Sequence, residues 1–186
     1  MLKTACDLDL LVLDDFLPSA DFDALARLML ETNTPFGWFL EKVLTEEYGQ
    51  DLSQDRQMSH LFYSDVLFRP TSDYWVHLLP AIRLLNPTAL LRVKANLQWR
   101  AAEQIERNFH TDVPLHRCEG IKTAVLYMNT NNGYTKFEDG RRVDSVSNRL
   151  AVFDACLYHT GVAAKDVDCR VVVNFDFVGQ FPQVKA

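Results

Sequence analysis

The chain has 186 residues, of which 48% are hydrophobic and 24% charged, the balance expected of one globular domain over residues 1–186. Its formal charge of −6 and pI near 5.3 argue against nucleic-acid binding. No stretch reaches the roughly 20 apolar residues of a membrane span. Acidic residues from Asp7 onward interrupt any signal-like segment, so we expect a cytoplasmic protein without a membrane anchor.

The cysteines are widely scattered. The chain contains Cys6, Cys118, Cys156 and Cys169, and no two of them form a C-x-x-C pair. This spacing suggests neither a structural zinc site nor a disulfide framework. We therefore expect free thiols in a reducing compartment.

The first half of the sequence, to about residue 89, reads mainly as helical support. The expected elements are a strand over residues 10–13, a helix from Ser19 or Asp21, a helix over 36–48 and a helix capped by Thr71 or Ser72. Pro80 would kink that last helix or end its first half. Residues 58–69 are also read as helical, serving either as a lid or in plain helix packing.

From about residue 90 to 178 the pattern becomes strand-like, with short β-branched and aromatic runs between Asn, Gly and Asp. The expected strands cover residues 90–98, 122–129, 135–137, 141–146, 150–153 and 170–177, with turns at 131–133 and 139–140. The fold class is therefore mainly β with α (α+β). The favoured architecture is a sandwich or jelly roll with the N-terminal helices on one sheet.

One group of residues suggests metal chemistry. His110 and Asp112 share one side of an extended segment, and His159 follows a later strand. Two histidines and a carboxylate form the open triad of non-haem iron sites, whereas a structural zinc would have four ligands. The alternative is a surface His–Asp pair, and His116 is a weaker competing ligand. Arg170 begins a strand and either grips a carboxylate or pairs with a surface acid.

These residues belong to a longer ordered pattern. Its pieces are His110-Thr-Asp112, Thr123-Ala-Val-Leu-Tyr127-Met-Asn129, Asn132-Gly133-Tyr-Thr135-Lys-Phe137, Asn148-Arg-Leu-Ala-Val-Phe153, His159-Thr-Gly161 and Arg170. The sequence resembles the prolyl-hydroxylase-like 2-oxoglutarate/Fe(II)-dependent dioxygenases over nearly its whole length. The resemblance implies a double-stranded β-helix, or jelly roll.

The resemblance also implies roles for single residues. His110, Asp112 and His159 would bind Fe(II), and Arg170 would hold the distal carboxylate of 2-oxoglutarate. Tyr127 would donate a second hydrogen bond to that carboxylate, although a half-buried strand aromatic is the plain alternative.

Other positions support or depart from the pattern. Asn174 and Asn96 are expected beside the metal pocket, since Asn174 shares a strand face with the arginine four residues before it. Gly133 and Thr135 match a structural element at a strand start. Asn148 stands where many relatives have glycine.

The implied activity is oxidation of an unactivated C–H bond, with conversion of 2-oxoglutarate and O2 to succinate and CO2 and with ascorbate as an accessory reductant. The substrate would be a peptidyl proline, an amino acid or a small metabolite. Recognition is expected in residues 96–108, including Gln98, Arg100 and Arg107, and in 58–69. The alternative functions are a non-catalytic jelly-roll module that binds or senses metal, and a helical scaffold with an incidental His-X-Asp.

Overall fold

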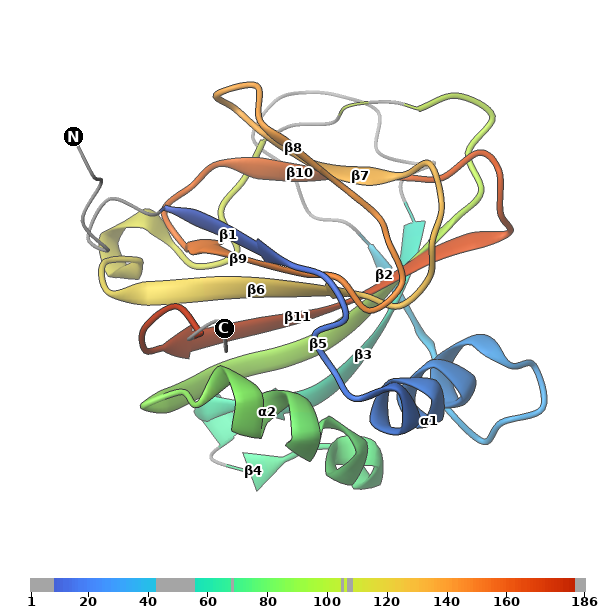
Figure 1. Ribbon diagram of the computed structural model, residues 1–186, viewed down its shortest axis with the longest axis horizontal. Coiled ribbons are helices and arrows are strands. Elements are labelled where there is room, and N and C mark those ends of the chain that lie inside the picture. The colour runs from blue at the N-terminus through green and yellow to red at the C-terminus, as the bar shows by residue number, and fades with distance from the viewer. Residues whose placement is uncertain (1–8, 43–55, 68, 105, 107–108, 183–186) are drawn as a thin grey trace.

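The structure is a computed structural model that describes residues 9–42, 56–67, 69–104, 106 and 109–182 (Figure 1). Its strands are β1 (Leu10–Leu13), β2 (Phe39–Lys42), β3 (Arg56–Ser64), β4 (Arg69–Pro70), β5 (Ala89–Trp99), β6 (Ile121–Tyr127), β7 (Tyr134–Phe137), β8 (Arg142–Asp144), β9 (Leu150–Asp154), β10 (His159–Val162) and β11 (Cys169–Val178). The α-helices are α1 (Ser19–Leu30) and α2 (Leu79–Leu85), and short 3-10 helices cover Asp65–Leu67, Asp73–Leu78 and Leu115–Arg117. None of these helices is long and apolar enough to cross a membrane.

The strands form two antiparallel sheets. The eight-stranded sheet has the order β1-β9-β6-β11-β5-β3-β2, with β4 paired to β3, and the three-stranded sheet has the order β10-β7-β8. The small sheet lies over the β1, β9 and β6 side of the large one, and both α-helices lie on the opposite side (Figure 1). The expected fold class, mainly β with α, is confirmed.

Each face of the large sheet has its own core. Against the helices, β11 contributes Val173 and Phe175, which pack with Leu25 of α1 and other buried side chains. Between the sheets, Tyr127 of β6 and Phe153 of β9 pack with side chains of the small sheet. The prediction that the helices cover one sheet is therefore confirmed.

The first half contains more strand than expected. The predicted helix over 36–48 is wrong where it is described, because Phe39–Lys42 is strand β2, paired with β3; residues 43–48 lie outside the described residues. Residues 58–69 do not form the predicted helix either, because Met58–Ser64 lie in strand β3, Asp65–Leu67 form only a short 3-10 helix, and residue 68 lies outside the described residues. The strand residues alternate with period two, with His60 and Phe62 buried on one face, and this typical strand signal was missed.

Other expected features of the first half are present. Strand β1 coincides with the predicted residues 10–13. Ser72 caps the following 3-10 helix, since its Oγ accepts a hydrogen bond from the backbone of Tyr74. Pro80 lies in the first turn of α2, where proline costs no hydrogen bond, so the helical stretch is divided there.

The second half follows the prediction closely. Each expected strand from residue 90 onward has a counterpart, whereas strand β10, which begins at His159, was not expected. Asn148 adopts a left-handed conformation with φ of 61°, which explains how it replaces a glycine. Its side chain also exchanges two hydrogen bonds with the backbone of Leu17, at 2.9 and 2.8 Å.

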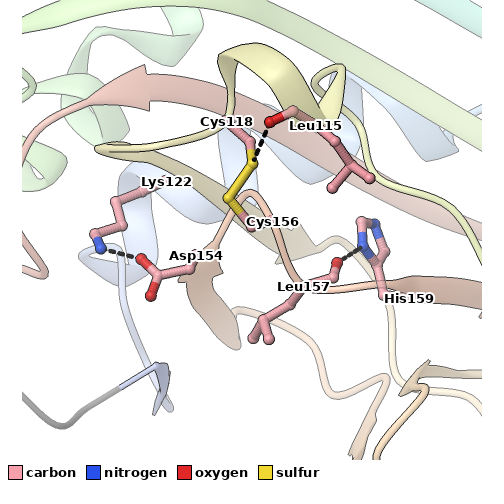
Figure 2. Close-up of a disulfide and its surroundings, with 7 residues drawn as sticks. All are labelled: Leu115, Cys118, Lys122, Asp154, Cys156, Leu157 and His159. Atoms are coloured by element: carbon pink, nitrogen blue, oxygen red, sulfur yellow. Dashed lines mark hydrogen bonds and ion pairs between the residues drawn. A yellow bond between two sulfur atoms is a disulfide. The ribbon is translucent and has the colours of Figure 1, made fainter.

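The expectation of free thiols is wrong for two cysteines. Cys118 and Cys156 form a disulfide (Figure 2), while Cys169 is free and Cys6 lies outside the described residues. The two sulfurs meet because the pairing of β6 with β9 continues to the Ala155 N–H, which donates to Ile121 O at 3.0 Å. The two cysteines are 38 positions apart in the sequence, and this separation does not indicate that they are close in space.

Candidate metal and carboxylate site

Three predicted metal ligands come together in the structure. One ligand atom from each of His110, Asp112 and His159 lies within 4.8 Å of the others. The backbones of the two histidines bridge each other, because the N–H of each donates to the carbonyl of the other at 2.9 Å. This pairing with the start of β10 brings the His-X-Asp segment next to a residue far along the chain.

His159 is oriented as a metal ligand requires. Its Nδ1 lies 3.0 Å from the carbonyl of Leu157, which can only accept, so Nδ1 carries the proton (Figure 2). Nε2 is then left facing Asp112, 3.6 Å from Oδ2. Burial lowers the pKa of His159, but the hydrogen bond and charge of Asp112 outweigh it and raise the pKa.

Asp112 is held by two further side chains. Arg92 of β5 lies 3.0 Å from its Oδ1, and Asn174 of β11 donates to its Oδ2 at 3.1 Å. Burial opposes ionisation, yet the hydrogen bond with His159 and the charge of Arg92 keep the pKa of Asp112 below its ordinary value. The carboxylate is therefore ionised, as a ligand must be.

Arg170 is a buried cation, with 3% of its surface exposed. Its three hydrogen bonds go to neutral atoms: Ser145 Oγ at 2.9 Å, Gln98 Oε1 at 3.1 Å and Thr135 Oγ1 at 3.2 Å. Among the described residues, no carboxylate lies within ion-pair distance of Arg170. Burial lowers its pKa, although Tyr127 opposes the shift.

This arrangement suits a carboxylate ligand. An unpaired buried charge is costly, and a guanidinium has five N–H donors, so two remain for a ligand. Tyr127 donates its O–H to Thr135 at 2.8 Å, and its ring lies 5.5 Å from the guanidinium. An anion beside Arg170 would be bound by the guanidinium charge and by the hydroxyl of Tyr127, in surroundings that exclude most water.

Gly133 makes room for Arg170. A Cβ at this position would lie 2.7 Å from Cδ of Arg170 and 2.7 Å from the carbonyl oxygen of Val162. Since one of these contacts is with backbone, no side-chain movement would relieve it. The glycine of the Asn-Gly-x-Thr element is therefore required for a close approach.

The remaining candidates are dispersed. Asn96 has a buried Oδ1 that finds no hydrogen-bond partner among the described residues, whereas Gln98 accepts a hydrogen bond from Arg170. Arg100 is exposed and pairs with Asp168 at 2.5 Å, and Arg107 lies outside the described residues. His116 is exposed in its 3-10 helix and is not part of the metal cluster.

The hypothesis that Met58, Phe62 and Tyr63 belong to a lid does not fit the structure. Phe62 is fully buried in the core beneath the helices, and Met58 packs against the same core. Tyr63 stacks on Trp75 with ring centroids 5.3 Å apart. These side chains are structural.

Sequence reasoning missed several neighbours of the site: Arg92, Asp176 and Ser145. Arg92 alternates with Lys94, Asn96 and Gln98 along β5, which gives this strand a polar face. That alternation is a signal in the sequence, but it does not indicate which acids the polar face meets.

Comparison with known proteins supports the fold. No protein-family model matches the chain, and neither does any curated protein. Among solved structures, a Pseudomonas putida prolyl-4-hydroxylase is similar, with a TM-score of 0.63 and 17% identity over 95% of both chains. A prolyl hydroxylase from Trichoplax adhaerens, in complex with a hypoxia-inducible-factor peptide, has a TM-score of 0.59 and 13% identity over 93% of this chain and 85% of that one.

A third solved structure is the non-haem α-ketoglutarate-dependent epimerase SnoN from nogalamycin biosynthesis. Its TM-score is 0.58, with 14% identity over 91% of this chain and 76% of that one. The chain therefore has the fold of prolyl-hydroxylase-like 2-oxoglutarate/Fe(II) oxygenases.

Proposed function

We propose that this protein is an Fe(II)- and 2-oxoglutarate-dependent dioxygenase, built as a single domain on a double-stranded β-helix. The observation that carries the proposal is the pairing of two features on one fold. An open triad of His110, Asp112 and His159 accompanies Arg170, a buried cation with only neutral partners. A closed structural metal site would need no such cation.

The triad fits Fe(II). Two imidazoles and one carboxylate are its preferred donors in this class of site, and they leave coordination positions free for 2-oxoglutarate and dioxygen. His159 presents Nε2 because Leu157 accepts from its Nδ1. Bound iron would supply the dioxygen chemistry that oxidises a C–H bond.

Arg170 and its neighbours fit the distal carboxylate of 2-oxoglutarate. The two remaining N–H donors of the guanidinium suit a carboxylate, which binds charged donors strongly. Tyr127 would turn its O–H from Thr135 to that carboxylate, or Thr135 would donate its own. These residues orient the co-substrate and exclude water from its distal end.

For the substrate we propose a peptidyl proline, an amino acid or a small metabolite, hydroxylated with release of succinate and CO2. The solved structures with this fold include a prolyl hydroxylase with its peptide and an epimerase acting in nogalamycin biosynthesis, so the same fold serves different substrates. Residues 96–108 remain our proposal for substrate recognition. Ascorbate as accessory reductant completes the proposal. The sequence-based expectation of a cytoplasmic location is kept as a proposal, and the Cys118–Cys156 disulfide is the observation that counts against it.

The test is succinate formation from 2-oxoglutarate with Fe(II), ascorbate and a panel of prolyl peptides, amino acids and metabolites. We expect the wild type to form succinate and Asp112→Ala to form none, while His116→Ala, which changes a nearby exposed histidine outside the triad, stays active. Metal binding without any binding of 2-oxoglutarate would instead support the non-catalytic metal-binding or sensing module.

A further inference from the structure

Arg92 lies between two buried carboxylates, and only one of them is a candidate metal ligand. Its Nη2 is 3.0 Å from Oδ1 of Asp112, and its Nε donates to Oδ2 of Asp176 at 2.7 Å. The side chains of Asp112 and Asp176 are 11% and 2% exposed. A planar guanidinium that binds two carboxylates through different nitrogens fixes the orientation of both.

The support for this arrangement comes from the centre of the large sheet. Thr123 of β6, Asp176 of β11 and Arg92 of β5 occupy one row across three neighbouring strands. The O–H of Thr123 donates to Oδ1 of Asp176 at 2.9 Å, so both oxygens of that buried carboxylate have a partner. Arg92 is thus anchored on one side by residues with no role as ligands.

The two oxygens of Asp112 have different surroundings. Oδ1 faces Arg92, while Oδ2 faces His159 at 3.6 Å and accepts from Asn174. We propose that Arg92 and Asp176 are positioning residues: Arg92 occupies Oδ1 of Asp112, so that the ligand binds the metal through Oδ2 alone. Single-oxygen binding keeps one more coordination position open for the substrates. This inference rests on the metal site of the proposed function.

Asp176 has a second effect, on charge. The cation of Arg92 beside a ligand would weaken the attraction of Asp112 for a divalent metal ion, and the carboxylate of Asp176 offsets it. Replacing Asp176 by asparagine keeps the shape and leaves Asp112 to balance the charge of Arg92, so less of its negative charge is available to a metal ion. Since partners of metal ligands typically change metal affinity by 10- to 100-fold, we expect Asp176→Asn to weaken metal binding about tenfold or more.

A purely structural ion pair between β5 and β11 makes a different prediction. Removing it would lower the melting temperature of the metal-free protein but leave the affinity of the folded protein for metal unchanged. Asp176→Asn should do the reverse, because Arg92 keeps Asp112 as its ion-pair partner, the asparagine oxygen can accept from Arg92 and the asparagine NH2 can donate to Thr123. Measuring the melting temperature and the metal affinity of one variant therefore distinguishes a positioning role from a purely structural ion pair.

The experiment is calorimetric titration of metal-free protein with Ni²⁺, together with thermal melting of the same samples. The variants are Asp176→Asn, Arg92→Lys and the double variant Arg92→Met/Asp176→Asn. The control is Asp139→Asn, because Asp139 and Asp9 likewise flank one arginine, Arg141, away from the cluster.

We expect Asp176→Asn to bind Ni²⁺ about tenfold more weakly with an unchanged or higher melting temperature, and the control to bind like the wild type. The double variant, which has lost both opposite charges, should regain part of the affinity. Arg92→Lys, which cannot reach both carboxylates, should also bind more weakly. Wild-type affinity in a folded Asp176→Asn, or in Arg92→Lys if the former does not fold, overturns the inference. Failure of the wild type to bind Ni²⁺ would overturn the proposed metal site instead.

Discussion

The disulfide between Cys118 and Cys156 should contribute strongly to stability and little to metal binding. Replacing both cysteines by serine frees a loop of 38 positions, for which the chain-entropy relation gives a loss of about 4 kcal/mol. Domains of this size are stable by roughly 5–15 kcal/mol, so the loss is a large fraction. With the entropy of unfolding expected for 186 residues, it corresponds to a fall in Tm of roughly 10 °C.

The candidate metal ligands near this disulfide are held by other contacts. His159 is fixed by strand β10 and by its two backbone hydrogen bonds with His110, so Ni²⁺ affinity should change by less than about threefold. Urea unfolding measures the stability and calorimetry measures the Ni²⁺ affinity. The number of free thiols titrated per unfolded wild-type chain should rise by two on reduction. A loss of stability below about 1 kcal/mol would refute the argument from loop closure.

Three further outcomes are expected. Gly133→Ala should weaken 2-oxoglutarate binding at least about tenfold, since its Cβ would crowd both Arg170 and the backbone of Val162; equal calorimetric affinity for 2-oxoglutarate would contradict this. Asn148→Ala should lower the free energy of unfolding by about 2–4 kcal/mol in urea, because left-handed strain is added and two hydrogen bonds are lost; Asn148→Gly should lose less. Burial lowers the pKa of His60, so this residue contributes stability that is present above pH 6.5 and falls as the pH is lowered through it. The raised pKa values of His159 and Asp176 change stability with the opposite sign, so the measurement is the difference in unfolding free energy between the wild type and His60→Asn. This difference should decrease as the pH is lowered from about 7.5 to 5, and a constant difference would contradict the assignment.

The strand-rich half of the fold was predictable because its local signals agree with its environment. Residues 90–98 and 170–177 combine β-branched side chains with alternation, and they became the adjoining strands β5 and β11. The first half was harder to predict. Residues 36–48 look helical by composition, yet Phe39–Lys42 pairs with β3 as a strand. Pairing between distant segments decided that structure.

The same division applies to the site. The clustering of His110, Asp112 and His159 was predicted because their order and spacing match a known pattern, and Arg170 was singled out because it follows at the expected place. Arg92 was missed, since its contact with Asp112 depends on the register of β5 against β11. Register is set by tertiary pairing and by the bulge after Asp176, and neither can be read from the local sequence.

The most direct test of the central claim is calorimetric titration of 2-oxoglutarate into Ni²⁺-loaded protein. The account predicts that the wild type binds 2-oxoglutarate and that Arg100→Lys binds it like the wild type. Arg170→Lys should bind it at least about tenfold more weakly, because the planar guanidinium with its several N–H donors is replaced by a compact ammonium group. Undiminished affinity in Arg170→Lys, or no binding by a wild type that holds Ni²⁺, would contradict it.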